Sequence, residues 1–363
     1  MIPATPPPLT IVHVVFSSRL AGAERHALDL AGAQADAGHQ VHVVTGGSTA
    51  LLRAMPANVG HHALPLPLLR GPRLDALARR LGADICHGHL GPACKAVARC
   101  DGPMRFGTLH VGYKPHQHER LDGLVCVNRD QWATLGTYLG AARVVYNWPP
   151  RPMTNATPGP RLRERLRLGD DQVLVGTVAR LHPSKGIDLL IRAFAQYAPG
   201  HAVLAILGEG PQERQLRRLA GGHPGIRFLG FRSDVDAALE DMDLFVSPSR
   251  EEALPLAVLE AMRAGLPIVA TRTQGLQQLL GDAPATLVDC EDITALGTAL
   301  QASIRGLRLP GHVRRFSRRR VMYDMGLYDR DAAVARIESF YRALLPSEEA
   351  STEADTSLGR SFA

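Results

Sequence analysis

The chain has 363 residues, of which 45% are hydrophobic and 21% charged, and its formal net charge is +6. This composition is ordinary for a soluble globular protein of about two domains, and the positive charge suits an anionic partner without choosing among nucleotide diphosphates, phosphorylated glycans, membrane surfaces and nucleic acids. The cysteines lack CxxC spacing and no stretch of 18 apolar residues occurs, which argues against a disulfide framework, a zinc site and a membrane-spanning helix. The five cysteines are Cys86, Cys94, Cys100, Cys126 and Cys290.

Short apolar runs alternate with amphipathic segments such as Ala23–Ala37 and Arg73–Leu81 through residues 1–150. Runs that are apolar nearly throughout are typical of strands buried on both faces of a parallel sheet. The alternation predicts a Rossmann-like, doubly wound α/β domain. Its expected strands are Thr10–Phe16, Val41–Thr45, His61–Leu64, Asp84–His87, Arg105–Thr108, Gly123–Val127 and Arg143–Tyr146. The run Ile11–Phe16 is too short for a signal peptide, so we expect a cytoplasmic protein.

The segment Trp148–Pro160 contains five prolines and a glycine, and it predicts an interdomain linker. Residues 151–165 are expected to hold this linker and the start of the second domain, and residues 166–325 a second Rossmann-like domain. The expected strands of that domain are Gln172–Val178, Ala202–Leu207, Ile226–Leu229, Leu244–Ser247, Pro267–Ala270 and Ala285–Val288.

The C-terminal part has three expected pieces. The stretch Arg314–Arg320 is basic and contains an aromatic residue, but no nucleic-acid motif frames it, and anionic lipid or a phosphorylated acceptor is an equal alternative. Residues 326–346 are expected to hold a helix, because the sequence of Ala332–Leu345 is typical of one. The polar composition of residues 347–363 predicts a disordered tail.

The segment Ser247–Thr271 carries the most chemical information. A strand leads into a loop and then into a helix that starts near Pro255, where free backbone amides favour an anion. Glu252 lies before the helix and Glu260 over a turn inside it. Carboxylates accept hydrogen bonds from sugar hydroxyls well, so one could hold a ribose and the other a sugar ring. Taken alone, the pair favours a capping glutamate and a solvated helix glutamate, and only the surrounding pattern reverses that interpretation.

A second loop, Gly176–Gly186, places Arg180 and Lys185 at a strand–loop–helix junction. Two cations there can stabilise a diphosphate leaving group without a metal, although surface cations are common in any loop. Gly208 follows another strand and predicts a tight turn.

In the first domain, Gly22 opens a helix after the first strand, and His110 ends the fifth strand. The carboxyl end of a parallel strand is where ligands bind in open α/β sheets. His87 and His89 also lie at a strand end; a metal pair is an alternative there, but no further ligand has telling spacing, so we favour a structural or cleft-lining role. Two Asp-x-Asp triplets, Asp234–Asp236 and Asp241–Asp243, are interpreted as structural.

These motifs resemble the signature of the family 4 retaining glycosyltransferases, and the resemblance covers nearly the whole chain. It implies the GT-B fold: two Rossmann-like domains, an interdomain cleft that holds the donor, and a C-terminal helix that crosses back to the first domain. It further implies that Glu260 binds the nucleotide ribose and Glu252 the hydroxyls of the transferred sugar, while Arg180 and Lys185 bind the donor phosphates. The remaining implied donor contacts are Gly22, Gly208, Ala253, Leu254 and Leu256, and His110 is expected beside the donor sugar in a catalytic role.

Three alanines stand where the family usually has glycine: Ala21, Ala179 and Ala253. The resemblance nevertheless implies a hexosyl or related transferase that moves a sugar from a nucleotide-diphosphate donor to a glycan or glycolipid acceptor, with retention of configuration. Lipopolysaccharide or another cell-envelope polysaccharide is the expected pathway, and peripheral contact with the inner face of an anionic membrane stays open. No cofactor, essential metal or nucleic acid is expected. The alternatives are a sugar-nucleotide epimerase on the same fold and a non-catalytic sugar-nucleotide-binding protein.

Overall fold

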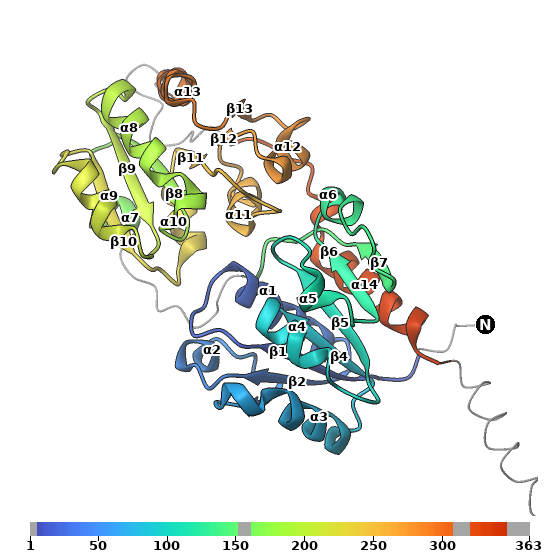
Figure 1. The fold of residues 1–363 in the computed structure, drawn as a ribbon. Helices are drawn as coiled ribbons and strands as arrows, with labels where there is room; N and C mark the ends of the chain where they lie inside the picture. The colour runs from blue at the N-terminus through green and yellow to red at the C-terminus, as the bar shows by residue number, and fades with distance from the viewer. Residues whose placement is uncertain (1–5, 152–160, 308–319, 347–363) are drawn as a thin grey trace, which may run out of the picture. The chain divides into compact units, whose positions relative to one another are not determined.

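The computed structural model describes residues 6–151, 161–307 and 320–346, which form two compact units (Figure 1). The first unit contains residues up to Val145 and takes up the chain again at Asp331, while the second contains Tyr146–Arg330. The expected disordered tail 347–363, most of the expected linker (152–160) and all of the basic stretch except Arg320 lie outside the described residues.

The first unit is built on a seven-stranded parallel sheet in the order β3-β2-β1-β4-β5-β6-β7. Each expected strand is present within two residues, because apolar runs this short and this continuous are buried on both faces. The strands are β1 (Thr10–Val15), β2 (Gln40–Thr45), β3 (Gly60–Ala63), β4 (Ile85–His89), β5 (Met104–Leu109), β6 (Gly123–Cys126) and β7 (Ala141–Val144).

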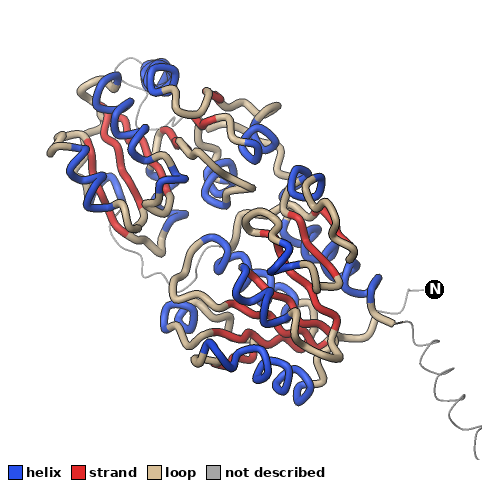
Figure 2. The backbone as a smooth tube through the Cα atoms, viewed as in Figure 1, coloured by secondary structure: helices blue, strands red, loops and turns tan. Residues whose placement is uncertain are grey.

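Helices cover both faces of this sheet, which Figure 2 shows as blue coils around red strands. The helices are α1 (Gly22–Asp36), α2 (Thr49–Arg53), η1 (Pro67–Leu69), α3 (Arg70–Leu81), α4 (Gly91–Val97), α5 (Pro115–His118), α6 (Arg129–Ala133) and α14 (Arg330–Leu344). Successive side chains of a strand point to opposite faces. Val12 and Val14 therefore share a core with Leu74 and Leu77 of α3, while His13 points to the other face.

The C-terminal helix α14 is part of the first unit. Its Tyr341 is fully buried, and the Tyr341 ring lies 4.7 Å from that of Phe106 in β5. The Phe340 ring also packs edge-on against Phe106, with 5.2 Å between the centroids. Large aromatic side chains buried in this way anchor the helix to the sheet, although nearly 200 residues of chain separate them from β7.

The second unit has a six-stranded parallel sheet in the order β10-β9-β8-β11-β12-β13. Its strands are β8 (Val173–Val178), β9 (Ala202–Leu207), β10 (Ile226–Gly230), β11 (Leu244–Ser247), β12 (Ile268–Thr271) and β13 (Thr286–Val288). Its helices are α7 (Leu162–Arg165), η2 (Pro183–Lys185), α8 (Ile187–Tyr197), α9 (Glu213–Ala220), α10 (Val235–Asp241), α11 (Leu256–Arg263), α12 (Gln274–Leu280), α13 (Ile293–Leu307) and η3 (Gly326–Tyr328). The expected fold class, two Rossmann-like α/β domains, is confirmed.

Trp148, expected at the start of the linker, is instead fully buried in the second unit. An indole has too much apolar surface to be left in solvent when a core lies within reach. Among the described helices, none is long and apolar enough to cross a membrane.

Candidate functional site

The strand order reverses once in each sheet, between β1 and β4 in the first unit and between β8 and β11 in the second. Ligands of open α/β sheets bind outside the carboxyl ends of the strands at such a switch point. The loops that follow β8 and β11, together with helix α11, hold seven of the ten expected site residues. These two strands pair in parallel, with Phe245 opposite Gly176, so the loops leave the sheet side by side.

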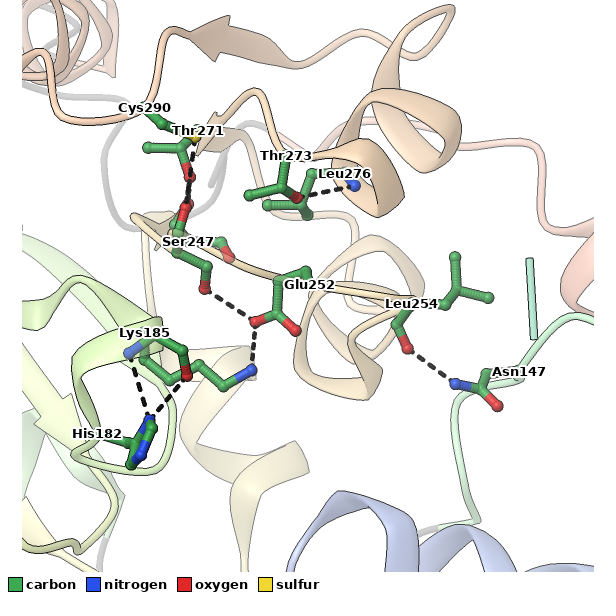
Figure 3. A network of polar contacts seen from close by, with 12 residues as sticks. Asn147, His182, Lys185, Ser247, Glu252, Leu254, Thr271, Thr273, Leu276 and Cys290 are labelled. Atoms are coloured by element: carbon green, nitrogen blue, oxygen red, sulfur yellow. Dashed lines mark hydrogen bonds and ion pairs between the residues drawn. The ribbon is translucent and has the colours of Figure 1, made fainter. Parts of the chain in front are cut away.

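Lys185 and Glu252 meet at this switch point, one from each loop (Figure 3). The Lys185 ammonium donates to Oε1 of Glu252 across 2.7 Å, and the Ser249 hydroxyl donates to the same oxygen across 2.8 Å. The side chains of Lys185 and Glu252 are only 26% and 10% exposed. Among the described residues, Oε2 of Glu252 accepts no hydrogen bond, so the carboxylate is held by one oxygen and offers the other.

Arg250 ties the two loops together. Its guanidinium donates to both carboxylate oxygens of Asp188, each across 2.8 Å, and to the Pro183 carbonyl. Its backbone amide donates to the Ser184 carbonyl across 2.8 Å. The Arg250 guanidinium lowers the pKa of Asp188, and the two carboxylates of Asp188 and Glu291 raise the pKa of Arg250. Paired, bidentate contacts of this kind fix geometry, so they hold the two loops against each other.

Glycines allow the loops to approach so closely. Gly186 has φ +60°, and a Cβ there would lie 1.9 Å from the Pro248 carbonyl oxygen. At Gly275, in the first turn of α12, a Cβ would lie 1.8 Å from the Ala253 carbonyl oxygen. Gly208 has φ +131° and packs in the same way on the Ala179 carbonyl. A side chain at any of these three positions would force backbone apart.

The rest of the expected donor segment is largely buried. Helix α11 begins at Leu256, and Glu260, four residues on, lies on the same side of the helix with 2% exposure. Leu254 is 4% exposed, and its carbonyl accepts a hydrogen bond from Asn147 Nδ2 across 2.8 Å. A carboxylate as buried as that of Glu260 is not the solvated surface glutamate of the structural alternative.

Arg180 does not join this network. Its side chain is exposed, and its guanidinium makes no ion pair or hydrogen bond among the described residues. The structure thus brings together Lys185 and Glu252 but leaves Arg180 apart from them, two residues beyond the end of β8.

All four carboxylates of the two Asp-x-Asp triplets pair with arginines of the second unit. Asp234 pairs with Arg232 and Asp236 with Arg263. The other triplet is held by the segment before β8, with Arg161 on Asp241 and Arg163 on Asp243. These carboxylates therefore have structural partners, which for the second triplet are Arg161 and Arg163 at the start of α7.

In the first unit, Gly22 is the exposed first residue of α1. The turn before it is fixed by Glu24, whose carboxylate accepts the Ala21 amide across 3.0 Å. This is half of a capping box, with Ala21 in place of the usual hydroxyl residue.

His110 lies at the outer end of a row of histidines. Its Nε2 lies 3.1 Å from Nδ1 of His89, whose Nε2 lies 3.0 Å from Nδ1 of His13. Nε2 of His13 lies 2.7 Å from Oε1 of Gln34 in α1. His110 is partly exposed, whereas His13, His89 and Gln34 are fully buried. Burial lowers the pKa of His13 to about 4 and also lowers that of His89 and His110, so these rings are neutral at pH 7.

His87 belongs to a separate branch. Its Nε2 lies 2.8 Å from the Thr108 hydroxyl, and its Nδ1 shares a hydrogen bond with the Tyr341 hydroxyl of α14. One nitrogen each from His13, His87 and His89 lie within 4.8 Å of one another, close enough to share a cation. Every one of those six ring nitrogens is already placed in a hydrogen bond, so a metal would have to displace several of them.

Sequence reasoning missed several residues of both networks. In the second unit these are Asn147, Ser249, Arg250 and Gly275; Ser249 and Arg250 stand in the loop already singled out, but Asn147 and Gly275 carry no signal in the sequence. In the first unit they are His13, Gln34 and Tyr341. The two-residue spacing of His87 and His89 and the alternation of strand faces could have indicated a shared histidine face.

Known proteins resemble both halves of the chain. Residues 20–148 match the family described as Glycosyltransferase Family 4, and residues 172–305 match Glycosyl transferases group 1. A GDP-mannose-dependent alpha-(1-6)-phosphatidylinositol monomannoside mannosyltransferase of Mycolicibacterium smegmatis is 33% identical over 66% of this chain and 64% of its own length. The lipopolysaccharide core biosynthesis glycosyltransferase LpsD of Rhizobium meliloti is 30% identical over 53% of this chain and 55% of its own. The matches thus span less than two thirds of these relatives.

A solved structure of Anabaena Alr3699/HepE in complex with UDP-glucose has the same fold, with a TM-score of 0.67 at 20% identity over 91% of this chain and 99% of that one. Two parallel-sheet units, together with this likeness to a solved glycosyltransferase-type structure, define a protein of the GT-B fold. The chain belongs to the group 1 and family 4 glycosyltransferases.

Proposed function

We propose that the protein transfers a hexosyl or related sugar from a nucleotide-diphosphate donor to a glycan or glycolipid acceptor of the cell envelope, with retention of anomeric configuration. The observation that carries the proposal is the Lys185–Glu252 pair at the switch point of the second unit, with one carboxylate oxygen engaged and the other available. A cation and a carboxylate held 2.7 Å apart suit a ligand that has both phosphates and hydroxyls.

In this proposal, Oε2 of Glu252 accepts a hydroxyl of the transferred sugar, and Glu260 accepts the ribose hydroxyls. Lys185 lies beside the diphosphate and stabilises the negative charge that grows on it as the glycosidic bond breaks. The pair is pre-organised because Ser249 and Arg250 hold its loop before any ligand arrives. Arg180 has no partner within the described residues, and we assign it to the same diphosphate.

The backbone near Ala253, Leu254 and Leu256 is assigned to the donor as well, together with the turn at Gly208. Gly22 and His110 of the first unit are assigned to the donor side of the reaction by the family resemblance. The charge that Lys185 and Arg180 supply could replace a divalent metal, so we propose a metal-independent reaction without a further cofactor. Full activity in excess chelator is the expected result, and strict dependence on an added metal would contradict it.

The acceptor is proposed from chemistry that the relatives share. The mannosyltransferase relative is named for a phosphatidylinositol monomannoside, and the LpsD relative for lipopolysaccharide core synthesis. The net charge of +6 suits an acceptor that carries phosphate or lies in an anionic surface. We therefore propose a lipid-linked envelope glycan, reached from the inner face of the membrane.

The donor assignment can be tested with variants of adjacent glutamates. Glu252→Gln keeps the size of the side chain but removes its charge, and Glu260→Ala removes the second carboxylate. With a panel of nucleotide sugars that includes UDP-glucose and GDP-mannose, the wild-type protein should gain thermal stability with one donor. Turnover of that donor, measured as release of nucleoside diphosphate, should fall about 10²–10³-fold in Glu252→Gln and be abolished in Glu260→Ala.

The matched control is Glu251→Gln. Glu251 neighbours Glu252 in the same loop, but its side chain is exposed. This variant should keep wild-type turnover. Wild-type rates in Glu252→Gln or Glu260→Ala would contradict the site assignment. Conversion of the donor without any acceptor would instead indicate the epimerase alternative.

A further inference from the structure

The histidine row of the first unit forms one continuous chain of hydrogen bonds from a buried glutamine to a partly exposed histidine. Gln34, His13, His89 and His110 are joined by three consecutive hydrogen bonds of 2.7, 3.0 and 3.1 Å. They come from α1, β1, β4 and the position directly after β5, and they meet because β1 and β4 are neighbours at the switch point. His13 and His89 are fully buried, so water does not compete for their ring nitrogens.

A neutral imidazole has one nitrogen that donates and one that accepts. Oε1 of Gln34 can only accept, so Nε2 of His13 carries the proton and Nδ1 of His13 accepts. Nε2 of His89 must then donate to His13, which leaves Nδ1 of His89 as an acceptor. It follows that Nε2 of His110 donates to His89 and that Nδ1 of His110 carries no proton.

We propose that Gln34 sets the tautomer of His110 through His13 and His89, so that the chain ends in an unprotonated Nδ1 that accepts a hydrogen bond from a ligand hydroxyl. Nδ1 of His110 makes no hydrogen bond among the described residues, and His110 is the one member of the row that is partly exposed. Gln34, His13 and His89 are positioning residues, because they act through His110. The identity of the hydroxyl as one of the donor or acceptor sugar rests on the proposed function; the tautomer does not.

This tautomer of His110 requires all three rings to be neutral at working pH. Desolvation lowers the pKa of each ring, and the neighbouring rings add to the effect: His87 and His13 lower the pKa of His89, and His26 lowers that of His110. A proton added to His13 or His89 would place two donors against each other in the row, which opposes protonation of these two rings further. The competing use of these nitrogens is a metal shared by His13, His87 and His89.

The first experiment needs no variant. In the ¹⁵N-labelled full chain at neutral pH, two-bond ¹⁵N–¹H correlation spectra distinguish protonated from unprotonated ring nitrogens. We expect an unprotonated Nδ1 and a protonated Nε2 at His110, assigned by the loss of that signal in His110→Gln. A protonated Nδ1 at His110 would mean that the Gln34 amide is turned over and the row runs in the opposite direction, which overturns the proposal. A spectrum that changes on addition of Zn²⁺ at equimolar concentration would favour the shared metal and also overturn it.

The second experiment removes the hydrogen-bond acceptor that Gln34 offers to His13. Gln34→Met has nearly the same length but offers no acceptor, so the row loses its direction and both tautomers of His110 should be populated. If about half of the molecules keep the competent tautomer, kcat/KM should fall about twofold. A single, unchanged tautomer in a folded Gln34→Met protein would contradict the proposal.

A matched control comes from the other side of the same sheet. His42 and His62 form a histidine pair on β2 and β3, 3.2 Å apart, outside the row. His42→Asn should leave the His110 signals and the turnover unchanged. If the tautomer is as expected but no nucleotide sugar is turned over, the proposed function fails and this inference stands; if turnover occurs with the opposite tautomer, the reverse holds.

Discussion

The switch point of the first unit and that of the second are built from different side chains. In the second unit, Lys185, Glu252 and Arg250 form ion pairs that are partly open to solvent. In the first unit, histidines whose pKa values are lowered by burial form a row without charge. In our proposal, the charges that act on a phosphate are held by other charges, whereas the group that offers a lone pair is held by neutral neighbours. The same sheet topology thus supports two kinds of polar site.

The largest expected effect is a loss of stability in the first unit that leaves the second unit unchanged. Tyr341→Ala removes a fully buried ring that packs on Phe106 and hydrogen-bonds to His87. We expect a loss of about 3–5 kcal/mol in the free energy of unfolding of the first unit. Hydrogen exchange followed by mass spectrometry should show faster exchange in β4 and β5 and no change in β8 and β11. Equal acceleration in both sheets would mean that the two units unfold together. Tyr341→Phe, which keeps the ring, should lose only about 1 kcal/mol.

The next effect breaks the second unit instead. Gly186→Ala introduces a side chain at φ +60° and against the Pro248 carbonyl, so the loops of Lys185 and Glu252 must separate. We expect a loss of about 2–4 kcal/mol in stability and a weaker thermal shift with the nucleotide sugar, with the histidine signals unchanged. Gly200→Ala is the control, because a Cβ there meets nothing within 4 Å. Donor binding equal to wild type in Gly186→Ala would contradict the close packing of the loops.

The smallest expected effect is a difference between the two units in how their stability depends on pH. The pKa of His13 falls from 6.5 in the unfolded chain to about 4 in the fold, so the unfolded state binds the proton first as pH falls. Its contribution is fully present above pH 6.5 and is lost between pH 6.5 and 4, about 3 kcal/mol at most. His26, with a pKa of about 3, acts in the same direction. The pKa of Asp188 is lowered from 3.8, so the Arg250 contact is lost only below that pH.

Hydrogen exchange at pH 7, 6 and 5 measures this difference. Peptides of β1 and β4 should lose protection over that series, after correction for the intrinsic rate, while those of β8 and β11 keep it. His26→Leu, which removes one of the buried titrating rings, should flatten the pH dependence in the first unit. Parallel losses in both sheets would contradict the assignment of the acid sensitivity to the histidines.

Much of the fold could be predicted from the sequence, because buried parallel strands are continuous apolar runs and their positions follow from that pattern alone. The charged site was also within reach, since Lys185, Glu252 and Glu260 stand in recognisable motifs next to predicted strands. The histidine row was not. It depends on which strands are neighbours in the sheet and on Gln34 arriving from α1, while the separate His87 branch depends on Tyr341 arriving from α14 at the other end of the chain.

Close approach of loops was the other feature beyond the sequence. A glycine such as Gly275 has many uses, and only the structure identifies the Ala253 carbonyl that it accommodates. Trp148 is a second example of what the sequence did not predict. Its proline-rich neighbourhood predicted a linker, but its indole is buried in the second unit.

The return of α14 to the first unit has a consequence for synthesis on the ribosome. The hydrogen bond between His87 and Tyr341 joins residues 254 positions apart. Domains generally fold in the order in which they emerge, yet here the second unit, Tyr146–Arg330, leaves the ribosome before the last helix of the first. The unit that is translated first is therefore completed last, and until then the face of β4 and β5 that Tyr341 covers stays open to chaperones.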